Sequence, residues 1–368
     1  MLVDFYTGFC YSFILALAVL LAYFSVKAKD ARLKLLFLVL SFLIVSMFCG
    51  LRFFVGNDYG GYYYIFRNCR LGYPTRIEPS FFLLNKIFSN STYGYIYVLF
   101  VSSVITVWLL YKLLIKCNIL YLGVFFLFTL NLLIMINDQV RQGIALSIFL
   151  YGFQYVEKKF FFKYSLFVIL ATTFHYTAIL LLPLYFIRCF TFKPWMWIFL
   201  LLLVFFLHRI GLLSNIVVSV LEHTPIYGEI YQTKGVYFEA VQESSGLGTL
   251  YKLIIALVVA ISYNKMKRNY YVDLFLIGSI LNIFFVGFLL AERVSFYLLY
   301  ANVVALPLLY LSTKKKIIRL FILVIPLTYF VVQSFSGLES HGAVPYRTFF
   351  LEKDLVNPPS PYFRDKYR

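Results

Sequence analysis

Charged residues are scarce in this chain. They make up 13% of its 368 residues, which is about half their share in an ordinary soluble domain. Hydrophobic residues account for 62% and aromatic residues for 21%, and the mean hydropathy is +0.84. This composition excludes a soluble enzyme, a disordered chain and a receptor with a single membrane span, since none of them contains so much apolar sequence.

The sequence also lacks the motifs of several enzyme classes. It contains no HExxH, no DxD and no Walker-type glycine loop, and no cluster of His or Cys at ligand spacing. The five cysteines are an odd number without a CxxC pair, which indicates neither a disulfide framework nor a metal site. We therefore expect no metal and no other cofactor.

Long apolar runs take up most of the chain. One bilayer crossing needs about 20 apolar residues, and a helix is the form in which such a run satisfies its own backbone polar groups in lipid. We expect an all-α, polytopic transmembrane bundle of about 11–12 membrane helices. The runs fall at residues 5–26, 35–55, 93–111, 119–136, 142–156, 164–187, 195–207, 210–221, 250–263, 274–291, 294–312 and 320–334. Two of them, within 195–221, are short enough to be re-entrant, so the topology there stays open.

The charge pattern predicts which side of the membrane each loop faces. The net charge is +17, which in a soluble protein would suggest nucleic acid. Here 16 of the 33 basic residues lie in five short connections between apolar runs. Short loops rich in Lys and Arg stay in the cytoplasm, so no nucleic-acid partner is expected. The five connections are residues 27–34, 112–118, 157–163, 264–270 and 313–319.

The alternate connections should then face outward. We expect a transmembrane domain over residues 1–334 with outer loops at 56–92 and 222–249, followed by a polar tail, 335–368, on the outer face. Polar residues of interest collect on this side, which predicts an outward-facing cavity ringed by charges. For any one of them, the simpler interpretation is that it marks the point where a helix leaves the bilayer.

Three arginines on the outer side are candidates for phosphate binding. Arg52 and Arg141 lie within or beside apolar sequence, where a guanidinium exposed to lipid would be costly. Arg293 follows Glu292 in another tight outer turn. Because arginine can grip phosphate with two parallel hydrogen bonds, three of them on different helices could clamp a pyrophosphate at the membrane surface.

His175 stands within the apolar run 164–187. A neutral histidine that is hydrogen-bonded to a neighbouring Tyr or Thr would account for it in structural terms. The imidazole group also suits proton transfer near neutral pH, so a general base or hydrogen-bond donor at the floor of the cavity is the functional interpretation. Tyr59 opens a tyrosine-rich stretch of the first outer loop, which fits either an interfacial belt or a surface on which carbohydrate stacks.

Four segments, taken in order, resemble the EpsG family of bacterial polysaccharide-repeat polymerases, a branch of the Wzy-like proteins. They read GLRFFVGNDY at 50–59, EPSF at 78–81, NDQVRQGIA at 137–145 and HYTA at 175–178. The similarity extends from about residue 45 to 190, with weaker support from Glu292 and Arg293 and from residues 345–347.

The resemblance implies an inner-membrane enzyme with its active site facing the periplasm. Such an enzyme joins oligosaccharide repeat units linked to undecaprenyl diphosphate into O-antigen, capsule or exopolysaccharide chains, without a metal. Its partners would be that lipid-linked oligosaccharide, the bilayer and a chain-length regulator protein. Arg52, Arg141 and Arg293 would then hold the pyrophosphate of the donor chain.

The resemblance also assigns roles to the remaining candidates. His175 or Asp138 would take the proton of the attacking sugar hydroxyl, the first favoured by its chemistry and the second by its accessibility. The residues expected to contact substrate are Asp58, Tyr59, Glu78 and Gln142.

Other functions fit the same sequence. An O-antigen ligase or a lipid-linked-sugar glycosyltransferase would share the cavity and the arginines and differ in the acceptor. A lipid-linked oligosaccharide flippase would move the substrate without forming a bond. An ion-coupled transporter is disfavoured, because the apolar runs carry few acidic residues or lysines near the expected midplane.

Overall fold

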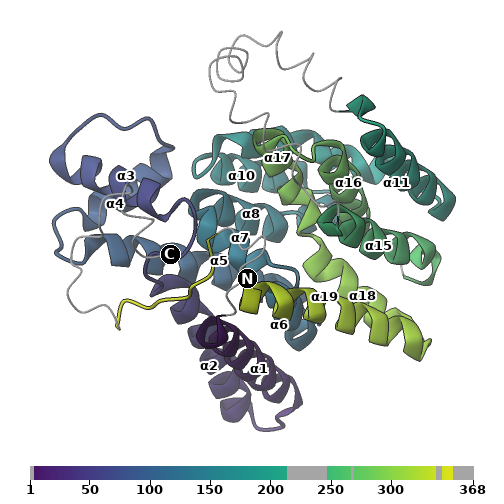
Figure 1. Cartoon of the computed structure of the whole chain (residues 1–368), viewed down its shortest axis with the longest axis horizontal. Coiled ribbons are helices and arrows are strands. Elements are labelled where there is room, and N and C mark those ends of the chain that lie inside the picture. The colour runs from purple at the N-terminus through teal and green to yellow at the C-terminus, as the bar shows by residue number, and fades with distance from the viewer. Residues whose placement is uncertain (1–3, 214–246, 267–268, 337–341, 351–368) are drawn as a thin grey trace. The chain divides into compact units, whose positions relative to one another are not determined.

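The computed structural model describes residues 4–213, 247–266, 269–336 and 342–350. Their regular secondary structure consists of helices together with one isolated β-bridge (Figure 1). This confirms the predicted all-α polytopic class. Residues 222–246 of the predicted outer loop 222–249 and most of the run 210–221 lie outside the described residues, and residues 247–249 belong to a helix.

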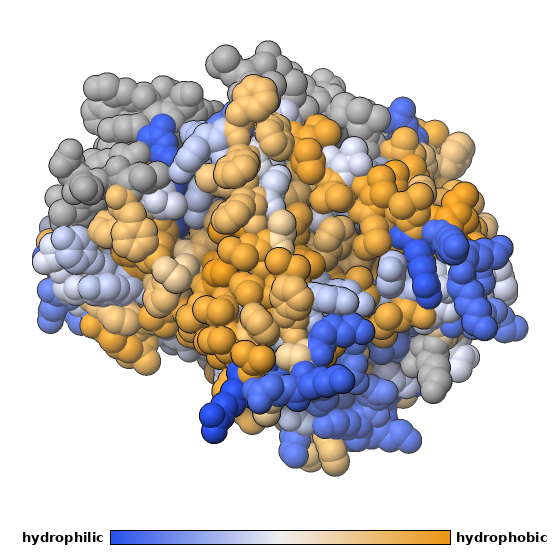
Figure 2. Space-filling model, turned by 90° about the horizontal axis from the view of Figure 1, so that it is seen from below, coloured by the Kyte–Doolittle hydropathy of each residue, from blue (hydrophilic) through white to orange (hydrophobic). Residues whose placement is uncertain are grey.

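Within the described residues, five helices are long and apolar enough to cross a membrane, and one bent pair counts as a sixth if it forms a single span. Five further apolar helices have 10–17 residues. How many of them cross fully stays a prediction. The five long helices are Phe5–Lys27, Ala31–Gly50, Gly94–Lys116, Ala291–Ser312 and Lys316–Ser336. Figure 2 shows the apolar surface that such helices give to one face of the molecule, with hydrophilic side chains gathered along its lower edge.

The chain divides into two compact units, residues 1–185 with 323–368, and residues 186–322. In the first unit, α1 packs on α2 and α6, and α5 packs on α2 and α8, which in turn packs on α10. Its helices are α1 (Phe5–Lys27), α2 (Ala31–Gly50), α3 (Tyr59–Leu71), α4 (Pro79–Phe88), α5 (Gly94–Lys116), α6 (Leu120–Thr129), α7 (Leu132–Asp138), α8 (Val140–Gly152), α9 (Gln154–Glu157), α10 (Phe161–Thr172), the 3₁₀ helix η1 (Tyr176–Cys189), which runs past its boundary, and most of α19 (Lys316–Ser336).

The second unit is built around α16, which packs on α11, α15, α17 and α18. The predicted short run 195–207 is one continuous helix here, α11. The helices of this unit are α11 (Pro194–Arg209), α15 (Leu247–Ile261), the 3₁₀ helix η2 (Tyr263–Lys265), α16 (Tyr270–Phe284), α17 (Leu289–Leu299) and α18 (Asn302–Ser312).

Acidic side chains fix where the first two helices begin. The Asp4 carboxylate accepts the backbone N–H of Thr7 at 2.9 Å, and the Asp30 carboxylate accepts that of Arg32 at 2.8 Å. Each cap satisfies a backbone donor that has no partner within its own helix. The chain therefore turns between α1 and α2 at a defined point, inside the basic connection 27–34.

The apolar run 164–187 is broken, although the sequence suggested one continuous span. Helix α10 ends at Thr172 and η1 begins at Tyr176. The hydroxyls of Thr172 and Thr173 donate to the carbonyls of residues 168 and 170 at 2.9 and 2.7 Å, and such local bonds compete with helix continuation. His175 therefore lies at a break between two helices.

The C-terminal segment 342–350 returns to the loop that follows α2. The backbone N–H of Phe53 donates to the carbonyl of Arg347, and that of Phe349 donates to the carbonyl of Leu51, both at 2.9 Å. Arg52 and Thr348 form the antiparallel bridge between these pairs. The loop after α2 thus has its backbone held by residues from the far end of the chain.

Tyr346 anchors this segment in the first unit. Its side chain is buried, and its ring stacks on Phe48 with centroids 4.5 Å apart. Its hydroxyl donates to the Phe48 carbonyl at 2.9 Å, while its backbone N–H donates to the Thr7 hydroxyl at 2.7 Å. The anchor therefore joins α1, α2 and the C-terminal segment.

Candidate active site

Glu78 is the centre of the candidate site. It directly precedes Pro79, the first residue of α4, and is only 3% exposed. One carboxylate oxygen, Oε2, lies 2.6 Å from Nη1 of Arg141. The other, Oε1, lies 3.2 Å from Nδ1 of His175 and accepts the backbone N–H of Tyr176 at 3.3 Å. Three segments that are far apart in the sequence meet at one carboxylate.

Local chemistry brings these segments together. Proline suits the first position of a helix, because it lacks the N–H that would be unpaired there. The next residue, Ser80, donates its backbone N–H to the Thr173 carbonyl at 3.0 Å and its hydroxyl to the Thr173 hydroxyl at 2.8 Å. These bonds hold the start of α4 against the end of α10. The break after α10 then places His175 beside Glu78.

The surroundings keep Glu78 ionised. Burial by itself would raise the pKa of the carboxyl, because the charged form loses its hydration. The hydrogen bond with His175 and the positive charge of Arg141 outweigh burial and lower the pKa to about 2. Glu78 is therefore an acceptor of hydrogen bonds near neutral pH and is unsuited to taking up a proton.

The side chains of Arg141 and His175 are partly exposed, whereas the side chain of Glu78 is buried. Their side chains are 26% and 18% exposed, against 4% for the carboxylate. The guanidinium of Arg141 lies 5.8 Å from the centroid of the buried Tyr62 ring. Its Nε has no hydrogen-bond partner among the described residues. That nitrogen is itself buried, so what the two residues present is a partly exposed guanidinium and a partly exposed imidazole, both held by Glu78.

Arg52 has a different environment from Arg141. It is 1% exposed, and its guanidinium donates to three backbone carbonyls, those of Cys49, Val55 and Asn137, the last at 2.8 Å. These bonds join the end of α2, the following loop and α7. A phosphate could reach Arg52 only if this packing opened, so its predicted contact with pyrophosphate stays a prediction.

Asp138, the last residue of α7, contacts the loop before α3 at Asp58. The carboxylate of Asp138, which is 4% exposed, accepts the backbone N–H of Asp58 at 3.0 Å. The chain makes this approach through Gly56, which has a φ of +103° and leaves no room for a Cβ beside the Asn137 carbonyl. Asp138 thus holds the loop that leads into α3. It lacks the accessibility that the sequence suggested, and its predicted role as a base stays a prediction.

Tyr59 and Gln142 are also buried, at 1% and 2% exposure. The backbone carbonyl of Tyr59 accepts the hydroxyl of Tyr95 at 2.8 Å. Tyr59 is the first residue of α3, and Gln142 follows Arg141 on α8. Their predicted contact with substrate stays a prediction.

Arg293 lies on α17 in the second unit, so its predicted grouping with Arg141 stays a prediction. The neighbouring Glu292 forms its own polar cluster within that unit. Its Oε1 lies 3.4 Å from Nζ of Lys252 and accepts the side-chain amide of Asn282 at 3.1 Å. Among the described residues, no three His, Cys, Asp or Glu side chains lie close enough together to hold a metal ion.

The chain matches the model of a known protein family. The family model described as the EpsG family matches residues 35–348, which is most of the chain and includes Glu78, Arg141 and His175. No curated protein and no solved structure matches the chain significantly.

Proposed function

Because the chain belongs to the EpsG family, whose members are Wzy-like polymerases, we propose that it polymerises oligosaccharide repeat units carried on undecaprenyl diphosphate. The product would be an O-antigen, capsule or exopolysaccharide chain, made on the periplasmic face of the bacterial inner membrane without a metal. The observation that carries this proposal is the Glu78 carboxylate shared between Arg141 and His175.

The reaction transfers the growing chain to the incoming unit. A hydroxyl oxygen of the incoming sugar attacks the anomeric carbon that is attached to the diphosphate of the growing chain. A new glycosidic bond forms, and the bond from that carbon to the diphosphate breaks, with its electron pair leaving on the diphosphate. The hydroxyl proton must pass to a base.

In this scheme Arg141 binds the leaving diphosphate. A guanidinium has five N–H donors, and Glu78 takes one of them through Nη1. Nε is buried, so it is the exposed part of the guanidinium side chain that remains for phosphate oxygens. A fixed positive charge at this position stabilises the negative charge that develops on the leaving group, as a metal ion does in other glycosyl-transfer sites.

His175 takes the proton in this scheme. Because the ionised Glu78 can only accept a hydrogen bond, it favours the tautomer that carries the proton on Nδ1. The other ring nitrogen, Nε2, then has a free lone pair for the acceptor hydroxyl. A carboxylate that orients a histidine in this way is a recurring arrangement in acyl-transfer enzymes.

A deletion strain tests the reaction class. On a gel of surface glycan, loss of the protein should leave single-repeat caps. Loss of all surface glycan would instead indicate a flippase, and unattached long chains a ligase.

Complementation with variants tests the residues. His175→Ala and Arg141→Lys should each abolish long chains while the protein still inserts, because the first loses its proton acceptor and the second loses the planar fork. The matched controls are His208→Ala on α11 and Arg67→Lys on the exposed face of α3, and both should retain long chains. Normal polymer from Arg141→Lys, or from His175→Gln, would contradict the assigned roles.

A further inference from the structure

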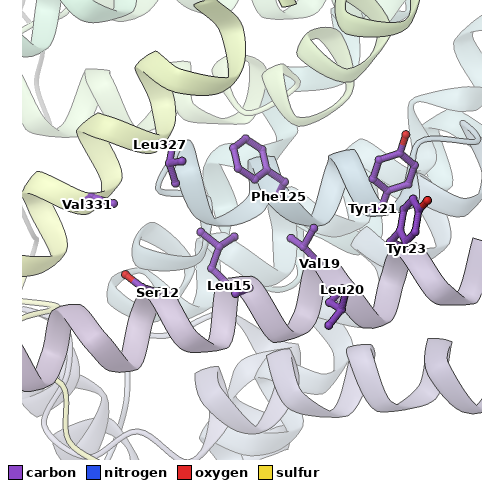
Figure 3. A pocket seen from close by; sticks show the side chains of 10 residues that line it. Ser12, Leu15, Val19, Leu20, Tyr23, Tyr121, Phe125, Leu327 and Val331 are labelled. Atoms are coloured by element: carbon purple, nitrogen blue, oxygen red, sulfur yellow. The ribbon is translucent and has the colours of Figure 1, made fainter. Parts of the chain in front are cut away.

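An apolar groove of about 490 Å³ runs along α1 in the first unit, between α6 and α19 (Figure 3). Val19 of α1, Phe125 of α6 and Leu327 of α19 line its middle. The volume falls within the range of about 300–1,000 Å³ that small-molecule sites have. Its lining has almost no hydrogen-bonding groups, so the shape suits a hydrocarbon chain.

The length of the groove corresponds to one leaflet of a bilayer. On α1 it extends from Ser12 to Tyr23, and a helix rises by about 16 Å over that interval. The hydrocarbon core of a membrane is about 30 Å thick. One acyl chain of a phospholipid therefore fits along the groove from the middle of the membrane to its surface.

The two ends of the groove differ in charge. At one end the rings of Tyr23 and Tyr121 meet edge to face, with centroids 5.5 Å apart, and Nζ of Lys27 lies 5.9 Å from the Tyr23 centroid. Two basic connections, 27–34 and 112–118, directly follow α1 and directly precede α6 at this end.

The opposite end leads to the start of α1, where Asp4 supplies a negative charge and the first 26 residues contain no Lys or Arg. The charge of Arg52 reaches Tyr11 at this end, but that guanidinium is buried and donates to backbone carbonyls. A phosphate head group is attracted by the lysines at the tyrosine end and repelled by the carboxylate at the other. The charges therefore fix the orientation of a bound lipid.

We propose that this groove is a binding site for one acyl chain of an anionic phospholipid, whose phosphate lies beside Lys27. The phosphate then belongs to the leaflet that contacts the basic connections. This orientation is opposite to that of a lipid diphosphate whose head group reacts on the outer side, so the proposed lipid supports the fold and is not the substrate.

The experiment measures the lipid that the protein retains. The full-length protein is reconstituted in nanodiscs of phosphatidylcholine in which phosphatidylglycerol is the minor lipid. It is then extracted in mild detergent, and the lipids that stay bound are identified by native mass spectrometry. We expect one phosphatidylglycerol per chain. Val19→Trp fills the groove and should reduce the retention of phosphatidylglycerol by about tenfold. Lys27→Gln should reduce it about fivefold, because one basic residue near a membrane surface strengthens the binding of an anionic lipid by about that factor.

Matched controls separate the groove from general surface effects. Val39→Trp lies on the exposed surface of α2, and Lys158→Gln removes another lysine that lies over a tyrosine ring, 5.4 Å from Tyr155. Both should retain the lipid as the wild type does. Equal retention by the Val19→Trp variant, or retention of phosphatidylcholine in place of phosphatidylglycerol, would overturn the proposal. Selective recovery of a polyprenyl diphosphate from protein purified out of its own membrane would overturn it as well.

Discussion

Glu78 and His175 are 97 residues apart in the chain, yet Oε1 of the first lies 3.2 Å from Nδ1 of the second. The same carboxylate holds Arg141 through its other oxygen. One buried anion therefore sets the position of both groups that the proposed reaction uses. This makes Glu78 the residue whose replacement is most informative.

Replacing Glu78 by Gln should greatly reduce polymerisation without preventing membrane insertion. Gln keeps the shape of the side chain but removes the charge that orients His175 and pairs with Arg141. In serine proteases, replacing the carboxylate that orients the histidine costs about 10⁴ in rate, and we expect a loss between tenfold and that value. The measurement is the rate of chain growth in reconstituted membranes. Glu157→Gln, at an exposed position, is the control and should grow chains at the wild-type rate.

The stability of the protein should depend on Glu78 at acid pH. The folded-state pKa of about 2 lies below the ordinary value of 4.5, so the stabilisation from its pairing is fully present above pH 4.5 and is lost as the pH falls towards 2. Thermal unfolding in detergent, measured from about pH 7 down to about pH 3, should show a steeper fall in the unfolding temperature for the wild type than for Glu78→Gln. Parallel curves for the two proteins would show that Glu78 is not the group responsible.

The basic connection 157–163 should be accessible only from the cytoplasm, because short loops rich in Lys resist translocation. A cysteine introduced at Lys159, in a background without the five native cysteines, tests this. It should not react with a membrane-impermeant thiol reagent in cells whose outer membrane alone is permeabilised, and it should react after lysis. Labelling in the intact cells would reverse the predicted orientation of this loop.

We expect the C-terminal segment to be needed for stability and for polymerisation, because Tyr346 anchors it. Removing a buried aromatic ring costs about 3–5 kcal/mol, so Tyr346→Ala should lower the unfolding temperature strongly and also reduce polymer length, since the segment supports the loop that contains Arg52. Tyr346→Phe loses one hydrogen bond, worth about 1 kcal/mol, and should keep activity. Tyr73→Ala, at a position that is 59% exposed, should behave as the wild type in both measurements.

The sequence allowed the helical class and most helix positions to be predicted, because lipid imposes one backbone solution on every apolar run. It did not predict where runs break. Asn131, in a left-handed conformation, separates α6 from α7, which are bent by 59°, and the hydroxyl bonds of Thr172 and Thr173 end α10 within an apolar stretch. These breaks depend on local hydrogen bonds that hydropathy does not register.

The structure brings three of the candidate site residues together in an arrangement that the sequence did not predict. Arg141 and His175 stand out in apolar sequence, whereas Glu78 was grouped with substrate contacts, and nothing in the spacing of the three connects them. Arg52 shows the opposite case. From sequence alone, an arginine beside an apolar run that binds a ligand cannot be distinguished from one that, like Arg52, donates to backbone carbonyls of its own chain.

The bonds between residues 51–53 and 347–349 also set the order of events during synthesis. At about 5–20 residues per second, the ribosome needs roughly 15–60 s after making Phe53 to reach Arg347. Through that interval the loop after α2 lacks its two backbone partners, and the neighbouring Arg52 and Asp58 lack the support that the finished chain provides. A membrane polysaccharide polymerase held together in this way would thus become competent only after residues 347–349 have been synthesised.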